Sequence, residues 1–305
     1  MNTQITNPKL RHDFVFLFDV ENGNPNGDPD AGNMPRVDPE TMHGLVTDVC
    51  IKRKIRDYVA MNYGGEPGCG IYIQNSGVAL NTINQQAYDE LGIKSTGTKQ
   101  NREDIDKARE YMCKNYYDIR MFGAVMTTGR NCGQVRGPVQ LTFAKSIDPI
   151  TPLDISITRV AITRPEDAEV AVADDSSEQG KGKTTEMGRK QLIPYGLYLG
   201  KGFFSPLFAE KTGVAEKDLE IFWEAMQNML EIDRSASRGL MSMRGIYVFT
   251  HDNAAGRAHA HTLFDHVSVS LKPGVEAPRS FADYVVEVCD KNLPEGVTLT
   301  KLELG

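Results

Sequence analysis

The sequence predicts an α+β fold in which a sheet and its helices are interrupted by long insertions. A wholly apolar run at the centre of residues 12–20 is typical of a buried strand. Residues 215–232 carry apolar side chains at the spacing of one helix face, which predicts a helix that packs on the sheet. Residues 22–36 and 164–191 have no apolar periodicity, and excursions of that length are either functional or disordered.

Further elements follow from the same periodicities. We expect helices at about 42–62 and 102–116, and strands at 71–73, 138–145, 155–162, 195–199, 245–250 and 263–271.

The helix expected over 42–62 has two chemically different faces. Its apolar arc would pack on the sheet and consists of Ile51, Ile55, Tyr58 and Val59. The opposite arc carries Lys52, Arg53 and Arg56, whereas Lys54 points elsewhere. A strand, an exposed loop and a cationic helix together indicate a place where an anionic group is held.

The composition is that of an ordinary globular protein. The 305 residues are 40% hydrophobic and 25% charged, which suits one large domain or two small ones. No apolar run approaches the ~20 residues of a membrane span, and the N-terminal residues lack the features of a signal peptide. Five scattered cysteines, never spaced as a C-x-x-C pair, argue for reduced thiols in the cytoplasm and against a zinc site.

Charge is unevenly distributed along the chain. Taken alone, a net charge of −7 argues against nucleic-acid binding. However, residues 119–147 contain four cations and no acid, and residues 234–251 contain three arginines and no acid. Residues 179–209 hold five cations against one glutamate, whereas 165–178 hold six acids. Such segregation predicts cationic patches on a chain that is acidic overall.

The loop at 22–36 is the most unusual segment, because twelve of its fifteen residues are Asn, Gly, Pro or Asp. Such a segment stays on the surface, where function is concentrated. Asp28 and Asp30 do not fit a calcium loop. With Asp19, Glu21 and Asp38 nearby, they leave a metal-dependent nuclease open. Turn-forming hydrogen bonds by these acids are the favoured interpretation.

Two motifs that suggest phosphate or RNA binding are incomplete. Residues 180–185 read GKGKTT, but a phosphate-binding loop requires glycine where Ser177 stands, so a flexible basic loop is preferred. Residues 201–204 read KGFF, like the start of an RNA-recognition signature, which Pro206 interrupts.

Four histidines lie close together in the sequence, and His259 and His261 would share one face of a strand. The group consists of His251, His259, His261 and His266. No cysteine or carboxylate completes a familiar tetrahedral set, so incidental histidines on a surface hairpin are favoured over a metal site.

Four motifs together resemble one family over essentially the whole chain. They are Gly23–Arg36 (GNPNGDPDAGNMPR), Asp48–Arg56 (DVCIKRKIR), Asp118–Gly123 (DIRMFG) and Gly196–Phe204 (GLYLGKGFF). They are similar to the repeated CRISPR RNA-binding backbone subunit of the type I-C Cascade complex, of the Csd type in the RAMP superfamily. The resemblance implies one right-hand-shaped domain over 1–305, built on an RRM-like (ferredoxin-like) palm. Its parts would be a surface loop at 22–41, fingers at about 64–117 and a thumb at about 164–200.

The resemblance also implies partners and a role. Several copies would stack head-to-tail as a helical filament along one CRISPR RNA, whose bases would pair with target DNA. Other partners would be the five-prime-handle-binding, large and small subunits of Cascade, with no membrane. Contacts to the guide should go to phosphate and sugar, because a filament must bind any guide sequence. We predict these RNA-binding residues: Arg36, Lys52, Arg53, Arg56, Arg120, Arg130, Arg136, Lys183, Met187, Arg189 and Lys190. Met187 or Leu192 would insert between guide bases.

The resemblance implies no enzyme, no catalytic residue, no metal and no cofactor. The alternative is a metal-dependent endoribonuclease that uses the Asp28 and Asp30 loop, since related subunits of type III systems cut target RNA from a comparable position. A scaffold that binds no nucleic acid also stays open.

Overall fold

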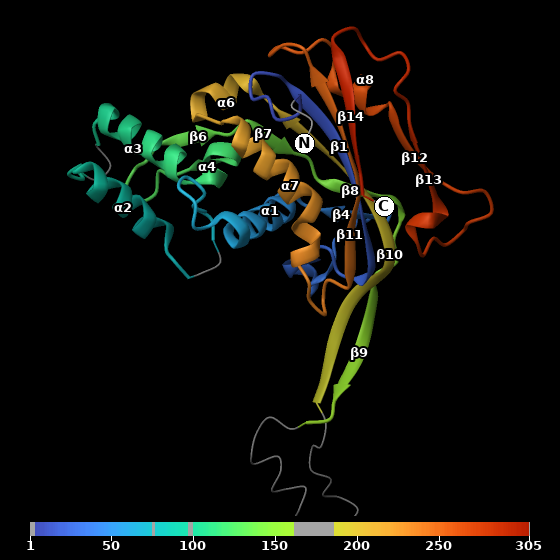
Figure 1. The fold of residues 1–305 in the computed structure, drawn as a ribbon. Helices are drawn as coiled ribbons and strands as arrows, with labels where there is room; N and C mark the ends of the chain where they lie inside the picture. Colours follow the sequence, from blue (N-terminus) through green and yellow to red (C-terminus); the bar gives the residue numbers. More distant parts are fainter. Residues whose placement is uncertain (1–3, 75–76, 97–99, 162–185, 305) are drawn as a thin grey trace, which may run out of the picture.

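The computed structural model describes residues 4–74, 77–96, 100–161 and 186–304 (Figure 1). It combines an antiparallel sheet with helices, so the mixed fold class predicted from the sequence is confirmed. The RRM-like identity of the sheet stays a prediction. Within the described ranges, none of the helices combines the length and the apolarity that crossing a membrane requires.

The helices are α1 Asp48–Tyr63, α2 Leu80–Leu91, α3 Arg102–Asn115, α4 Tyr117–Phe122, α6 Pro206–Thr212, α7 Glu216–Ile232 and α8 Ala260–Phe264, with short 3-10 turns η1 Pro29–Ala31 and η3 Phe281–Asp283. The strands of the main sheet are β1 His12–Gly23, β4 His43–Val46, β7 Val139–Leu141, β8 Ala144–Pro149, β9 Leu153–Arg159, β10 Glu186–Phe204, β11 Leu240–His251 and β14 Val297–Glu303. Three hairpins are β2 Gly27–Asp28 with β3 Met34–Pro35, β5 Gly123–Val125 with β6 Gln134–Arg136, and β12 Val267–Leu271 with β13 Tyr284–Val288.

The main sheet has the strand order β14–β11–β1–β10–β8–β4, and every neighbouring pair is antiparallel. β1 lies in the middle and divides the core into two layers, because its side chains alternate between the two faces. Phe14, Phe16 and Phe18 belong to one buried cluster together with residues of α1 and α7. Val15 and Leu17 belong to a second cluster with residues of α8 and the β12–β13 hairpin.

The apolar arc predicted for α1 is confirmed. Ile51, Ile55, Tyr58 and Val59 are all buried in the first cluster. α7 packs beside α1, and its Glu224 accepts a hydrogen bond of 2.8 Å from the Tyr58 hydroxyl.

The KGFF segment places one aromatic ring in each of the two core clusters. The Phe203 ring lies 5.7 Å from the Phe264 ring of α8, and Phe204 is buried in the first cluster. Both rings are therefore used for packing rather than presented to solvent as stacking platforms.

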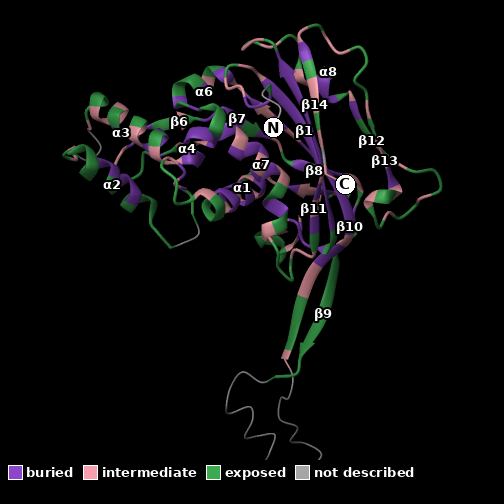
Figure 2. Cartoon of the chain, viewed as in Figure 1, coloured by how far each residue is buried: buried purple, intermediate pink, exposed green. Residues whose placement is uncertain are grey.

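The longest strand leaves the body of the protein. From residue 193 to 204, β10 pairs with β1 in the main sheet, and from 186 to 192 it pairs with β9 alone. These two strands form a projection (Figure 1), and we name residues 153–159 and 186–192 the arm. The body end of β10 is mostly buried, whereas every residue of β9 is exposed (Figure 2). The thumb expected over 164–200 stays a prediction, because 162–185 lie outside the described residues and 193–200 lie in the main sheet.

Several predicted boundaries are wrong for identifiable reasons. The helix expected from 42 begins at Asp48, because the Thr47 hydroxyl caps it by accepting a bond of 3.2 Å from the Cys50 amide. Residues 43–46 pair with β8 instead. The strand expected at 71–73 does not form, since the amides of Tyr72 and Ile73 donate to the Asp118 carboxylate at 2.8 and 3.0 Å.

Two other predicted strands are divided. The segment 138–145 is split into β7 and β8, with Thr142 between them bonded to the Lys201 carbonyl at 2.9 Å. The segment 263–271 begins as the last turn of α8 and becomes a strand only at Val267. Helix α2 was not predicted, although Ile83, Ala87 and Tyr88 form its buried face.

Candidate nucleic-acid interface

The loop at 22–36 is ordered by its own asparagine and aspartate side chains. Asp28 caps the η1 turn by accepting from the Asp30 amide at 3.1 Å. The Asn24 side-chain amide donates to the Asn33 backbone carbonyl at 2.8 Å, and the Asn26 side-chain oxygen Oδ1 accepts from both the backbone amide and the hydroxyl of Thr47 at 3.0 Å. The turn-forming role expected for the acids is confirmed for Asp28, and the loop is fastened to the start of α1 through Asn26.

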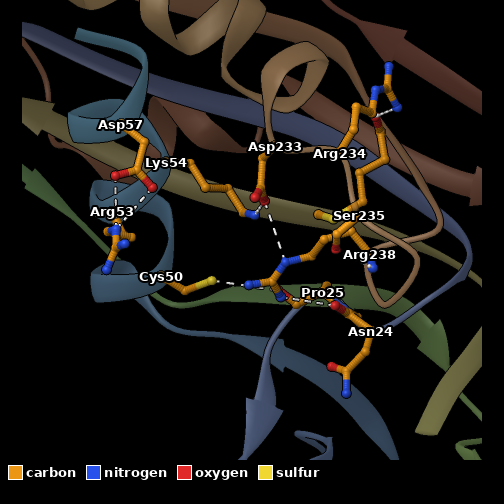
Figure 3. A network of polar contacts seen from close by, with 11 residues as sticks. Asn24, Pro25, Cys50, Arg53, Lys54, Asp57, Asp233, Arg234, Ser235 and Arg238 are labelled. Atoms are coloured by element: carbon orange, nitrogen blue, oxygen red, sulfur yellow. Dashed lines mark hydrogen bonds and ion pairs between the residues drawn. The ribbon is translucent and has the colours of Figure 1, made fainter. Parts of the chain in front are cut away.

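A polar network ties the same loop to the segment between α7 and β11 (Figure 3). Arg238 donates to the carbonyls of Asn24 and Pro25, each at 3.0 Å, and its guanidinium lies 3.5 Å from the Asp233 carboxylate. The approach is close, since a Cβ on Gly23 would lie 1.8 Å from the Arg238 carbonyl oxygen. The backbone of the loop is thus held on two sides.

Lys54 completes this network from α1. Its ammonium forms an ion pair with Asp233, and its side chain is only 5% exposed. Burial lowers the pKa of Lys54 to about 8. Cys50 and Asp57 oppose that effect and raise the pKa. Lys54 does point away from the other α1 cations, as expected. It joins α1 to Asp233 at the end of α7 and, through Arg238, to the loop at 22–36.

The cationic face predicted for α1 is neutralised by aspartates. Lys52 pairs with Asp48 at 3.0 Å and Arg53 with Asp57 at 2.9 Å, one helical turn away in each case. The side chain of Lys52 is 13% exposed and that of Arg53 is 42% exposed. Of these two side chains, only that of Arg53 is substantially exposed to solvent.

Arg56 and Arg120 are buried, contrary to the exposed position that the helix wheel suggested for Arg56. The Arg56 guanidinium lies 2.9 Å from the Asp118 carboxylate and covers the Phe122 ring. Arg120 donates to both oxygens of Asp218 at 2.6 and 3.1 Å, and also to the carbonyls of Cys113 and Gly68. Desolvated pairs of this kind hold elements together and leave no charge for a phosphate.

The remaining predicted cations lie in separate places. Arg36 is half-buried and pairs with Asp28 at 3.4 Å at the end of the loop. Arg130 donates to side chains of Gln85 and Ser95 next to α2. Arg136 is exposed on β6, with its guanidinium 4.3 Å from the centre of the Phe208 ring.

The arm carries the other group of predicted residues. The Met187 side chain is 76% exposed, and the Arg189 side chain is 73% exposed with Asp154 at 2.7 Å. Lys190 is half-exposed on the neighbouring position. Leu192 is 7% exposed at the base of the arm, so of the two residues proposed to insert between bases only Met187 faces solvent. Lys183 lies outside the described residues.

Three of the acids considered for metal binding, Asp19, Asp28 and Asp38, form other interactions. Asp19 is buried, where it accepts from the Tyr195 hydroxyl and pairs with Arg244 at 2.9 Å. Burial of the Tyr195 hydroxyl, and to a lesser extent the nearby Asp19 carboxylate, raises the pKa of Tyr195 well above its usual range. Across the described part of the chain, no group of three or more histidines, cysteines and carboxylates is arranged to hold a metal ion. The ribonuclease alternative therefore gains no support from the geometry.

The histidines do not form one hairpin face. His251 is buried in β11 with its Nε2 3.0 Å from the Asp13 carboxylate. His259 and His261 lie at the start of α8 with their rings stacked 5.7 Å apart, so their expected placement on a strand is wrong.

Sequence reasoning missed Asp233, Arg238 and Arg244 as residues that organise the loop and its strand. The acid-free arginine run over 234–251 was the only signal for the two arginines. The residues of the loop and of β1 that they bind, Asn24, Pro25 and Asp19, lie more than 200 residues earlier in the chain and could not be assigned from the sequence.

Comparisons with known proteins agree with the resemblance. The profile of the family described as CRISPR-associated protein Cas7 matches residues 10–289. A relative described as CRISPR-associated protein Cas7 from Haloferax volcanii is 24% identical over 302 aligned positions, covering 92% of this chain and 81% of the relative. A chain of a solved CRISPR RNA-guided surveillance complex in a pre-nicking state has a TM-score of 0.48 and 15% identity, covering 78% of each chain. A chain of another CRISPR RNA-guided surveillance complex has a TM-score of 0.43 and 15% identity, covering 78% of this chain and 68% of that one. Because the family profile extends over nearly the whole sequence, this chain belongs to the CRISPR-associated protein Cas7 family.

Proposed function

We propose that this chain is a non-catalytic backbone subunit that binds CRISPR RNA in a type I-C Cascade complex and acts in antiviral defence in the cytoplasm. The observation that carries the proposal is the Cas7 family match over residues 10–289. In this proposal the guide lies along several copies of the chain, and its bases pair with target DNA. The handle-binding, large and small subunits complete the assembly.

Exposure selects the residues that we propose for guide contacts. Phosphates can be reached by Arg36 at the loop, by Arg53 on α1 and by Arg189 and Lys190 on the arm. Met187 is the proposed side chain between bases. The proposal does not extend to Lys52, Arg56, Arg120 or Arg130, because their cationic groups are covered or bonded to the protein.

The right-hand description is part of the proposal. The main sheet would be the palm, the segment 64–117 the fingers and the segment 164–200, with the arm at its base, the thumb. A projecting arm suits head-to-tail stacking, since a heterologous contact needs different surfaces on the two partners.

Co-expression with a CRISPR array and the partner subunits tests this function directly. We expect the purified assembly to contain a discrete protected RNA and several copies of this chain per guide. Binding of RNA should weaken steeply with salt, because phosphate contacts release counterions. An assembly with every subunit present and no bound RNA contradicts the proposal.

The non-catalytic part has a separate test. Complementary RNA is incubated with the guide-loaded assembly and Mg²⁺ or Mn²⁺, and we expect it to stay intact. Metal-dependent cleavage that is lost in Asp28→Ala or Asp30→Ala would replace the proposal with the ribonuclease alternative.

A further inference from the structure

A cleft between α3, α6 and β6 lies apart from the guide contacts proposed above, and it contains Arg136, one of the RNA-binding residues predicted from the sequence. It consists of two adjoining hollows of about 490 and 450 Å³. The hollows share Arg109 and Cys113 of α3 with Lys211 and Thr212 of α6. Volumes of this size match the pockets that hold nucleotide-sized ligands.

The smaller hollow is lined by cations without an opposing acid. Arg109, Arg136 and Lys211 contribute to its wall, and none of its lining residues is a carboxylate. Arg109 also contacts Asp106 of its own helix at 3.0 Å, in a half-exposed pair that contributes little. The larger hollow adds Lys114 and is balanced by Glu110 and Glu210. Positive charge is therefore concentrated at the β6 end of the cleft.

An aromatic ring lies under one of these cations. The Arg136 guanidinium lies 4.3 Å from the centre of the Phe208 ring, and Arg136 is an exposed residue. A guanidinium stacked on an aromatic ring forms a flat, cationic platform, and such platforms stack well on nucleobases. The exposed Gln134 amide in the same hollow can hydrogen-bond a base edge.

The cleft lies at the far end of the molecule from the arm. β10 starts in the arm and runs into the body, and α6 follows it directly after Ser205 (Figure 1). Nineteen residues of strand span roughly 60 Å at about 3.3 Å per residue. Contacts in the cleft are thus separate from contacts on the arm.

We propose that this cleft binds nucleotides of a single-stranded nucleic acid, with a base stacked on Arg136 and phosphates paired with Lys211 and Arg109. A flat platform beside cations favours a nucleic acid over an acidic peptide, which has no flat group to stack. The strand can come from the guide or from a second strand, and the chemistry of recognition is the same for both. The proposal rests on the cleft and does not require that the arm or the loop binds the guide.

Crosslinking to the purified assembly distinguishes the two sources. In the first experiment the guide carries 4-thiouridine, and in the second an added poly-dT 15-mer carries 5-iododeoxyuridine. We expect photo-crosslinks in the peptides that contain 134–136 or 206–212. A crosslink from the guide assigns the cleft to the guide, and one from the added strand assigns it to a second strand. The same 15-mer is crosslinked to the RNA-free chain, so that failure of the proposed function does not hide the result.

Matched variants test the charges and the ring separately. Arg136→Ala with Lys211→Ala should reduce the crosslink yield at least fivefold and lower the log–log salt slope of binding by about 0.7, because Lys211 is the one phosphate contact that this variant loses. Phe208→Leu should reduce the yield without changing the slope. Lys107→Ala with Lys291→Ala removes the same charge from exposed positions outside the cleft and should change neither.

Three results would overturn the proposal. They are no crosslink in these peptides from either strand, equal yields from the cleft variant and the control variant, or a carbodiimide crosslink that joins Lys211 to a carboxylate of a neighbouring subunit in the assembly.

Discussion

Helix α1 and the arm use positive charge in opposite ways. On α1, four cations lie within five residues, and all four pair with aspartates. Three of these side chains are 13% exposed or less. On the arm, Arg189 also has an aspartate partner, but its side chain is 73% exposed.

The difference shows that burial, more than pairing, decides whether a cation is available to a ligand. A solvent-exposed ion pair contributes about 0–1 kcal/mol, so its cation can exchange the carboxylate for a phosphate at little cost. Breaking a buried pair leaves an isolated charge and costs about 3–5 kcal/mol. The buried cations of α1 are therefore committed to internal pairs, whereas Arg189 of the arm stays accessible to solvent.

The largest effect should come from removing a buried cation of the body. Arg120→Ala leaves the Asp218 carboxylate and three backbone carbonyls without their donor, and should lower the free energy of unfolding by about 3–5 kcal/mol. Urea unfolding followed by circular dichroism measures the change. A loss below about 1 kcal/mol would mean that this pair behaves like those on the surface.

The body should also show a pH dependence that the arm lacks. Burial lowers the pKa of His12 to about 4 from 6.5, while the Asn7 carbonyl, at 3.1 Å from Nε2, opposes the shift. Between pH 6.5 and 4 the unfolded chain binds a proton that the folded protein does not, so stability falls as the pH falls through this window. The loss is roughly 3 kcal/mol at full effect.

The His12 contribution is isolated by comparing variants at several pH values. In His12→Gln the slope of unfolding free energy against pH between 4 and 6.5 should be smaller than in the wild type. Arg189→Ala serves as the control and should leave the slope unchanged. Identical slopes in all three proteins would contradict the neutral, buried state of His12.

Two side chains of the arm should behave differently although they lie five residues apart. Leu192→Ala removes a buried side chain and should cost about 2 kcal/mol, whereas Met187→Ala should change stability by less than about 0.5 kcal/mol. Met187→Ala should instead weaken guide RNA binding in a filter-binding assay. If both variants are destabilised equally, the exposed position of Met187 has no functional meaning.

The arm cations should affect binding without affecting stability. Arg189→Ala with Lys190→Ala should change the unfolding free energy by less than about 0.5 kcal/mol and reduce the log–log salt slope of RNA binding by about 1.4. Titrations at four salt concentrations measure the slope. An unchanged slope would remove these two residues from the proposed guide contacts.

The smallest effect on stability is expected on α1 itself. Arg53→Ala breaks a half-exposed pair within the helix and should cost no more than about 0.5 kcal/mol. A cost comparable to that of Arg120→Ala would mean that exposure does not separate the two kinds of cation.

The sequence predicted elements best where periodicity was strong. The buried arc of α1, the strand at β1 and the helix at α7 follow from spacing alone, because one face of each packs in the core. The prediction failed where a side chain took the place of a backbone partner. Asp118 satisfies the amides of Tyr72 and Ile73, and this acid lies more than forty residues away in the sequence.

The sequence by itself determined the fold class, the order of the main elements and the family, because periodicity and motifs are local properties of the chain. Only the tertiary structure decided which cations of α1 face solvent. Their arcs on the helix were predictable, but the layers that cover those arcs come from α4 and the end of α7. Desolvation by these distant segments converts predicted phosphate ligands such as Arg56 into internal ion pairs, whereas Arg53, the arm and the α3–α6–β6 cleft keep exposed cations.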